Sequence, residues 1–199
     1  MIKKVYDLYP NFSYKWVDLK ECDTDRAEPD GINSLKDRWG EFRNMHSPTK
    51  VGKTVKDYTN LCSIEPIFSA KAVEILKEFF TCGELLPIKN EKGKDFFMYN
   101  FFPKVDYIDW YKSNILWYGE GDISKKTISH VFFYYFIPEK IHHHIFINNK
   151  DYGVFVTDIF VQKVIENNLK GFSFVPLWDI ETGGIEYFRD KEKNPRIIT

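Results

Sequence analysis

Three consecutive histidines, His142 to His144, are the residues of this chain best suited to metal chemistry. In a strand, His142 and His144 would lie on one face, and neutral imidazoles bind zinc or nickel. A metal site also needs a third ligand, and Glu139 is the only acidic residue close by in the sequence. We therefore expect no metal here, but an exposed turn or strand edge whose histidines titrate near neutral pH. A small metal-assisted hydrolase that uses His142 and His144 remains the alternative.

Residues 47–54 nearly match a phosphate-binding loop, with the sequence Ser-Pro-Thr-Lys-Val-Gly-Lys-Thr. Such a loop surrounds phosphate groups with consecutive backbone N–H groups and needs a glycine at its first position. Ser47 occupies that position, and Pro48 has no backbone N–H to offer. We therefore expect a plain loop here rather than a nucleotide site.

Acidic and nucleophilic side chains are present, but their spacing does not define a catalytic site. One group of acids could supply paired carboxylates for hydrolysis: Asp106, Asp109, Glu120 and Asp122. Nothing in the sequence fixes their separation, so we expect solvated acids that flank aromatic strands. No Gly-x-Ser-x-Gly segment positions a serine nucleophile. We therefore expect no catalytic residue and no cofactor.

Composition limits the partners and the compartment. The formal net charge is −1 and the pI about 6.5, so no overall positive field draws the chain to nucleic acid or to an anionic membrane. Cys22, Cys62 and Cys82 are far apart and form no CxxC motif, so we expect inert thiols in a reducing compartment. The first residues lack the apolar core of a signal peptide, and no apolar run reaches the roughly 18 residues of a membrane span. We expect a cytoplasmic protein.

A first helix is predicted to begin after Ser69, a residue type that caps helix N-termini. Apolar residues recur behind it at helical spacing, and Val73, Leu76 and Phe80 should be buried on one face. Gly83 is placed to end this helix.

A second helix is predicted to begin at Thr157 or Asp158 and to end before Gly171. Its expected buried stripe consists of apolar residues at helical spacing: Ile159, Val161, Val164, Ile165 and Leu169.

The remaining organised segments have the composition of β-strands. We expect a strand pair within residues 1–20 that is broken at Pro10, and an edge strand at 85–88 because Pro87 cannot donate to a ladder. Further strands are expected at residues 95–102, 114–118, 128–137, 145–147 and 172–176. The sequence therefore predicts a single α+β domain with a mixed, largely antiparallel sheet and a few covering helices.

Aromatic residues make up 18% of the chain and concentrate in the strands at 96–102 and 132–136. Both segments are apolar on both faces, so we expect them to lie mostly in the core. If one face were exposed, it would form a protein-binding platform. A homo-oligomeric structural protein that uses such a patch is a further alternative.

The order of short motifs from residue 68 to residue 178 resembles a known family. The motifs are Phe68-Ser-Ala-Lys-Ala-Val-Glu-Ile-Leu76, Leu86-Pro-Ile88, Tyr99-Asn100, Val105-Asp106 with Ser113, Ile145-Phe146, and the block Val154–Trp178. Together they resemble bacterial polymorphic-toxin immunity proteins of the type called immunity protein eleven. The resemblance covers about residues 60–178, and residues 1–59 match nothing in it. We expect one domain over residues 1–199, with a mobile tail at 190–199.

The resemblance implies a non-enzymatic protein that binds a secreted toxin encoded by an adjacent gene and so protects the producing cell. It implies no catalytic residues and no cofactor. The partner would be the cognate toxin, with no direct contact to nucleic acid or membrane.

An acidic stretch at residues 18–30 is the strongest local concentration of charge. Six acidic and two basic residues give it a local charge of −4, against −1 for the whole chain. We expect it to help recognise the toxin by steering a basic partner. The residues that we expect to bind the partner are Asp23, Asp25, Glu28 and Asp30.

Overall fold

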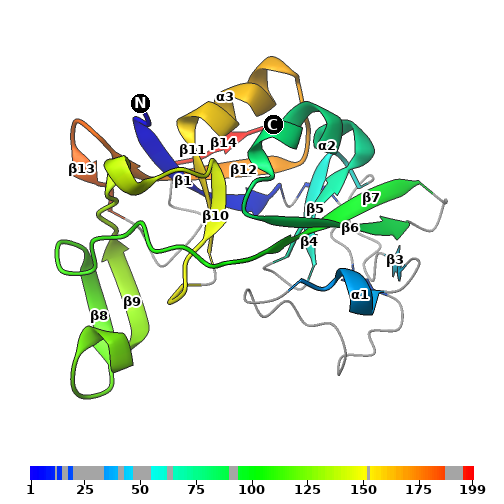
Figure 1. Ribbon diagram of the computed structural model, residues 1–199. Coiled ribbons are helices and arrows are strands. Elements are labelled where there is room, and N and C mark those ends of the chain that lie inside the picture. Colours follow the sequence, from blue (N-terminus) through cyan, green and yellow to red (C-terminus); the bar gives the residue numbers. More distant parts are fainter. Residues whose placement is uncertain are drawn as a thin grey trace.

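The computed structural model describes residues 1–11, 13–14, 18–19, 34–39, 43–46, 55–61, 65–89, 94–151, 153–186 and 195–199. Its strands form two larger sheets and a separate two-stranded arm, with two of the helices covering the sheets on one side (Figure 1). The class is α+β in a single domain, as predicted, and the strands are largely antiparallel. The expected single sheet is divided into two in the structure.

The first sheet is built around the N-terminal strand β1 (Lys4–Pro10), which lies between β11 and β12. Among the described residues the sheet has six strands in the order β10-β11-β1-β12-β13, with β14 added to β12, and all pairs are antiparallel. The other strands are β10 (Ile145–Ile147), β11 (Val154–Thr157), β12 (Phe172–Asp179), β13 (Gly183–Gly184) and β14 (Ile197–Ile198).

The second sheet has the order β2-β3-β6-β7-β5-β4 in the described part of the chain. Its strands are β2 (Asp18–Leu19), β3 (Arg43–His46), β4 (Tyr58–Leu61), β5 (Glu65–Ser69), β6 (Gly83–Lys89) and β7 (Asp95–Phe101). The β3–β6 pair is parallel and the others are antiparallel, which makes the sheet mixed, as expected. The aromatic strand predicted at residues 95–102 is β7, which runs from Asp95 to Phe101 and pairs with β5 and β6.

The arm consists of β8 (Asn114–Tyr118), a tip at residues 119–126 and β9 (Thr127–Phe133). The two strands pair only with each other among the described residues. Figure 1 shows the arm extending from the body, away from the helices.

The first predicted helix begins where the sequence places it. Helix α2 (Ala70–Leu76) is capped by Ser69, whose Oγ accepts the backbone N–H of Ala72 at 3.1 Å. It ends earlier than predicted, in the 3₁₀ turn η1 (Lys77–Phe79). Leu76 is fully buried as predicted, whereas Val73 and Phe80 are only partly buried at the edge of the core.

Gly83 and Gly171 are predicted to end helices, but Gly83 begins β6 and Gly171 directly precedes β12. Each has a positive φ, and a Cβ there would collide with backbone, that of Asn100 at Gly83 and that of Tyr58 at Gly171. Glycine is therefore needed for close approach between chain segments. This requirement comes from tertiary packing, which helix periodicity does not report.

Helix α3 (Asp158–Glu166) buries a face that is shifted from the predicted stripe. Val161, Val164 and Leu169 are buried as expected, but Ile159 and Ile165 are 38% and 48% exposed. Phe160 is fully buried in their place and contacts the rings of Phe79, Phe172 and Phe174. The helix is therefore rotated so that the larger aromatic side chain enters the core.

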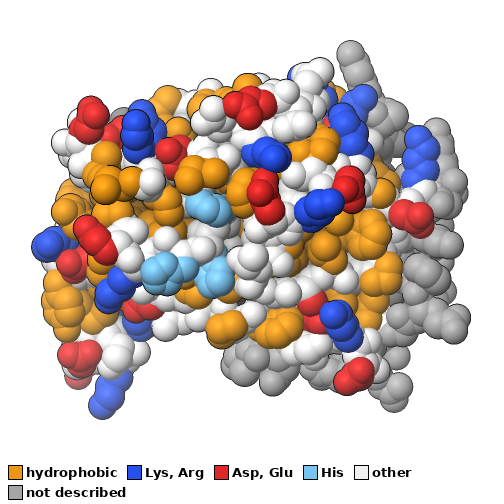
Figure 2. Space-filling view, turned by 45° about the horizontal axis from the view of Figure 1, so that its top comes forward, with side chains coloured by type: hydrophobic (Ala, Val, Ile, Leu, Met, Phe, Trp, Pro, Cys, Tyr) orange, Lys and Arg blue, Asp and Glu red, His pale blue; other side chains and the backbone are white. Residues whose placement is uncertain are grey.

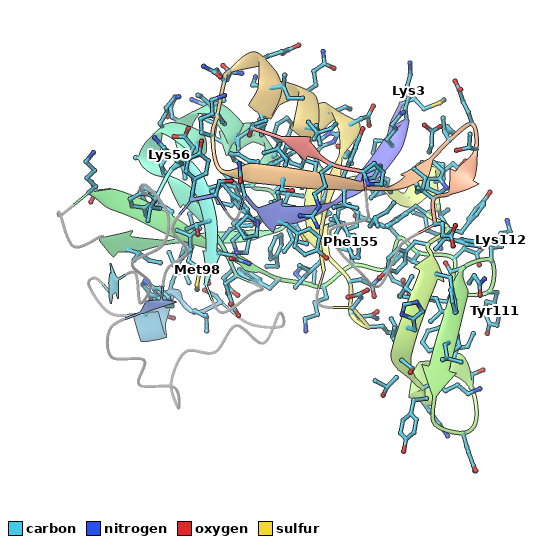
Figure 3. All side chains as sticks on the ribbon, turned by 180° about the vertical axis from the view of Figure 1, so that it is seen from behind. Lys3, Lys56, Met98, Tyr111, Lys112 and Phe155 are labelled. Atoms are coloured by element: carbon cyan, nitrogen blue, oxygen red, sulfur yellow. The ribbon has the colours of Figure 1, made fainter. Side chains whose placement is uncertain are left out.

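The largest core cluster joins the two helices to both sheets. Its fully buried residues include Phe68 of β5, Leu76 of α2, Phe160 of α3 and Phe174 of β12. A second cluster lies beneath the arm and contains the buried Phe155, which is labelled in Figure 3. A third cluster packs the short helix α1 (Lys36–Trp39) on the second sheet through Leu35 and Trp39.

Two strand predictions differ from the structure, and a short strand lies within the predicted tail. The strands at residues 1–20 do not pair with each other, because β1 pairs with β11 and β12 while β2 pairs with β3. The strand that contains Pro87 lies inside its sheet, between β3 and β7. It tolerates proline because β3 pairs only from Ile88 onward, and the Pro87 carbonyl accepts the indole N–H of Trp39 at 2.9 Å. Where a mobile tail was expected, β14 pairs with Ser173 and Phe174.

Candidate partner-binding surface

The three histidines lie just before β10, and two of them bond to threonines of other segments. His144 Nδ1 lies 2.8 Å from the Thr157 hydroxyl at the start of α3, and His143 Nδ1 lies 2.9 Å from the Thr81 hydroxyl after η1. His142 is exposed, as expected, while His143 and His144 are half-buried. Figure 2 shows histidine side chains gathered on one face of the molecule.

Burial of these rings affects their protonation. Desolvation lowers the pKa of His143, and the neighbouring His142 and His144 lower it further. Desolvation also lowers the pKa of His144, partly opposed by the charges of Asp158 and Glu78. The two rings therefore hold their protons less tightly than free histidine, in contrast to the near-neutral titration expected from the sequence.

Among the described residues, no group of three or more His, Cys, Asp or Glu side chains could hold a metal ion. The ring nitrogens that face the protein already hydrogen-bond to threonine hydroxyls. His143 and His144 therefore link the segment before β10 to Thr81 after η1 and to Thr157 at the start of α3. We call these two histidines and their threonine partners the histidine joint.

Three of the acids considered for hydrolysis hold local structure. Asp106 Oδ1 accepts the indole N–H of Trp110 at 2.9 Å and the Asn148 amide at 3.1 Å. Asp109 accepts backbone N–H groups of the following turn, and Asp122 caps the 3₁₀ turn η2 (Ile123–Lys125) within the tip of the arm. Asp109 and Asp122 therefore fix turns, and Asp106 joins the side chains of Trp110 and Asn148.

Cys82 is the cysteine that the structure describes, and it is buried. Desolvation raises the pKa of its thiol to about 11, and Sγ lies 3.2 Å from the Pro103 carbonyl oxygen. Such a thiol is an inert one at neutral pH, as the sequence predicted. Cys22 and Cys62 lie outside the described residues, as does the P-loop-like segment 47–54.

The four acidic residues expected to bind a partner, Asp23, Asp25, Glu28 and Asp30, also lie outside the described residues. The described chain on either side of them is attached to the second sheet. Leu19 pairs with Met45 in β3, and the backbone N–H of Leu35 donates to the Glu84 carboxylate at 2.5 Å. Residues 18–19 and 34–35, which are described on either side of this stretch, therefore lie at the second sheet.

The inner face of the arm packs on the second core cluster. Ile115 and Trp117 alternate with exposed residues along β8 and lie against this cluster with Ile128 of β9. The Trp117 ring meets the Trp110 ring edge-on at 5.7 Å. The inner face therefore fixes the arm to the body.

Two register shifts set the faces of β9. The pairs are Trp117 with Ile128 and Ile115 with Val131, so two apolar residues three apart point to the same side. Such bulges re-aim side chains along a strand. They place Val131 in the core and turn Phe132 outward.

The outer face of the arm consists of large side chains that no described element covers: Leu116, Tyr118, His130 and Phe132. Leu116 is 55% exposed, Tyr118 77% and Phe132 42%. His130 lies opposite Leu116 in the ladder, and its ring meets Phe132 edge-on at 4.6 Å. Tyr111, 81% exposed, lies beside the arm, as Figure 3 shows.

Both strands of the arm lack charged residues, although 29% of the chain is charged. The residues 114–118 and 127–133 contain no Asp, Glu, Lys or Arg, and the four charges of the tip sum to zero. Exposed edge strands commonly carry charges that discourage association. This outer face is the best candidate for a protein-binding surface in the described part of the molecule.

Only part of this surface is signalled by the sequence. The aromatic segment 132–136 was expected to be mostly core, and Phe136 is fully buried while Phe132 is exposed. The alternating pattern Ile-Leu-Trp-Tyr at 115–118 together with the uncharged partner strand could have indicated a sheet with two apolar faces.

Comparison with known proteins gives the class of the molecule. A family model described as Immunity protein family (Imm11) matches residues 76–179. The match spans more than half of the 199 residues and includes every strand from β6 to β12, and with them the whole arm and α3. The chain therefore belongs to this immunity protein family. No curated protein matches the chain.

Within the described part of the chain, no helix is long and apolar enough to cross a bilayer.

Proposed function

We propose that this chain is a non-enzymatic immunity protein that binds a cognate toxin and neutralises it in the cytoplasm, without a cofactor. Membership of the immunity protein family, through residues 76–179, is the observation that carries this proposal. The partner would be a toxin encoded by an adjacent gene.

The chemistry of the described side chains is consistent with a binding role. His143 and His144 bond to threonines, Asp106 accepts the Asn148 amide, and Asp122 caps a turn. The most exposed side chains of the arm strands are apolar and aromatic, which suits protein contacts. Neutralisation would follow from covering a surface that the toxin needs for its activity.

We also propose a role for the acidic stretch in the encounter with the toxin. Asp23, Asp25, Glu28 and Asp30 would steer a basic toxin surface during encounter, because complementary charge mainly raises association rates. A toxin that acts on nucleic acid would carry such a basic surface.

The proposal is tested by titrating a catalytically inactive form of the adjacent gene's toxin with the purified chain. We expect a saturable complex of fixed stoichiometry and, with active toxin, loss of activity at the same ratio. Absence of binding at micromolar concentrations, with both proteins folded, would refute the proposed function.

A further inference from the structure

We infer that the outer face of the β8–β9 arm is the surface on which the toxin docks, through an uncharged, apolar patch of the toxin. This inference deepens the proposed function and rests on it. It names a contact surface distinct from the acidic stretch.

The arm is held in place before any partner arrives. Ile115, Trp117 and Ile128 pack on the body. At the tip, Lys150 Nζ donates to the Ser124 carbonyl at 3.1 Å, and at the base the Tyr134 hydroxyl bonds to the Asp151 carboxylate. A fixed element loses little conformational entropy on binding, so its contacts contribute more fully to affinity.

The outer face has the composition of an interface centre. Leu116, Tyr118 and Phe132 present large apolar groups, and aromatic side chains are enriched among the residues that dominate binding energy. The charged residues of the arm, Glu120 and Asp122 with two lysines, are confined to the tip, where they would form a polar rim.

Charge complementarity and family membership identify the occupant. Because neither strand of the arm carries a formal charge, a charged partner surface would lose hydration here without gaining an ion pair. The matching surface must therefore be uncharged and apolar. The arm lies entirely within the residues that define the immunity family, whose proposed partner is a toxin.

The test compares two triple variants of the full chain for binding to the inactive toxin of the adjacent gene. The arm variant is Leu116→Ala, Tyr118→Ala and Phe132→Ala. The control variant, Ile159→Ala, Ile165→Ala and Ile198→Ala, removes equally exposed aliphatic groups from α3 and β14, on the opposite side of the body (Figure 1). Thermal unfolding of both variants establishes that they fold.

We expect the arm variant to raise Kd by about 30-fold or more, mainly through faster dissociation. The increase should be the same at low and high salt, because no charge is removed. The control variant should bind within about 3-fold of wild type, since scattered surface contacts contribute little.

Three results would overturn the inference. If wild type and arm variant bind the toxin equally, the arm is not the docking surface, although the proposed function stands. If the wild-type chain forms a dimer that the arm variant loses, a second copy occupies this face. If wild type does not bind the toxin, the proposed function itself fails, and the inference falls with it.

Discussion

Glu84 and Asn100 lie opposite each other on β6 and β7, and the Asn100 amide donates to the buried Glu84 carboxylate at 3.0 Å. The same carboxylate accepts the Leu35 backbone N–H and the Ser34 hydroxyl, so one side chain attaches the segment before α1 to the second sheet. Burial alone would raise the pKa of Glu84. These hydrogen bonds outweigh burial and hold the pKa below its ordinary value.

Replacing Glu84 should therefore destabilise the fold. Glu84→Ala removes the acceptor used by two buried donors, each worth about 1–3 kcal/mol, so we expect a loss of about 2–6 kcal/mol. Glu84→Gln keeps one acceptor oxygen and should cost less, about 1–2 kcal/mol. Urea denaturation at neutral pH measures both. Equal, negligible losses would show that the carboxylate does not attach this segment.

Leu76 tests the position of the largest core cluster. Its side chain is fully buried, so Leu76→Ala should cost about 2–5 kcal/mol in free energy of unfolding. Ile165→Ala on α3 is the matched control, because that side chain is 48% exposed and should change stability by about 0.5 kcal/mol or less. Similar losses in both variants would contradict the packing of α2 described above.

The histidine joint predicts a pH dependence of stability. The pKa values of His143 and His144 are lowered on folding, mainly by burial, so the unfolded chain binds protons more readily. Stability is therefore present above the unfolded-state value of about 6.5 and is lost as pH falls toward the lower folded-state values. The double variant His143→Gln, His144→Gln should unfold with a shallower dependence between pH 7 and pH 5. Parallel curves for the two proteins would show that these rings do not cause the loss.

The acidic stretch predicts an effect on association alone. Changing Asp23 and Asp25 to Asn and Glu28 to Gln should slow association with the toxin by about 10-fold at low ionic strength, and less at high salt. Stability should barely change, because exposed charges contribute little to it. Stopped-flow or surface-binding kinetics at two salt concentrations separate this effect from that of the arm, which should act on dissociation at both. Equal association rates at low salt would remove the stretch from the encounter.

The sequence predicts those features that depend on residues close together in the chain. The Ser69 cap depends on a bond to Ala72, three residues away, and turn-bounded strands such as β7 carry their own composition. The sequence does not predict features that depend on contacts between residues far apart in the chain. The rotation of α3 depends on Phe160 meeting β12, and the role of Glu84 depends on partners at residues 34, 35 and 100.

The candidate partner-binding surface likewise has one aspect that the sequence predicts and one that it does not. The family resemblance carried by motifs between residues 68 and 178 predicted the class, and the matched residues 76–179 confirm it. The outer face of the arm depends on two register shifts, which decide that Phe132 points outward while Val131 enters the core. A shift of one residue reverses the face of every side chain beyond it, and the alternation of one strand does not reveal such a shift in its partner.

The central claim is that this chain protects a cell from its cognate toxin by binding it. Its most direct test is the growth of bacterial cells that express the adjacent gene's active toxin together with wild-type chain, the arm variant or the α3–β14 control variant, at equal protein levels. We predict that wild type and control restore growth and that the arm variant restores it poorly. Failure of wild-type chain at a molar excess over the toxin to restore growth would contradict the account.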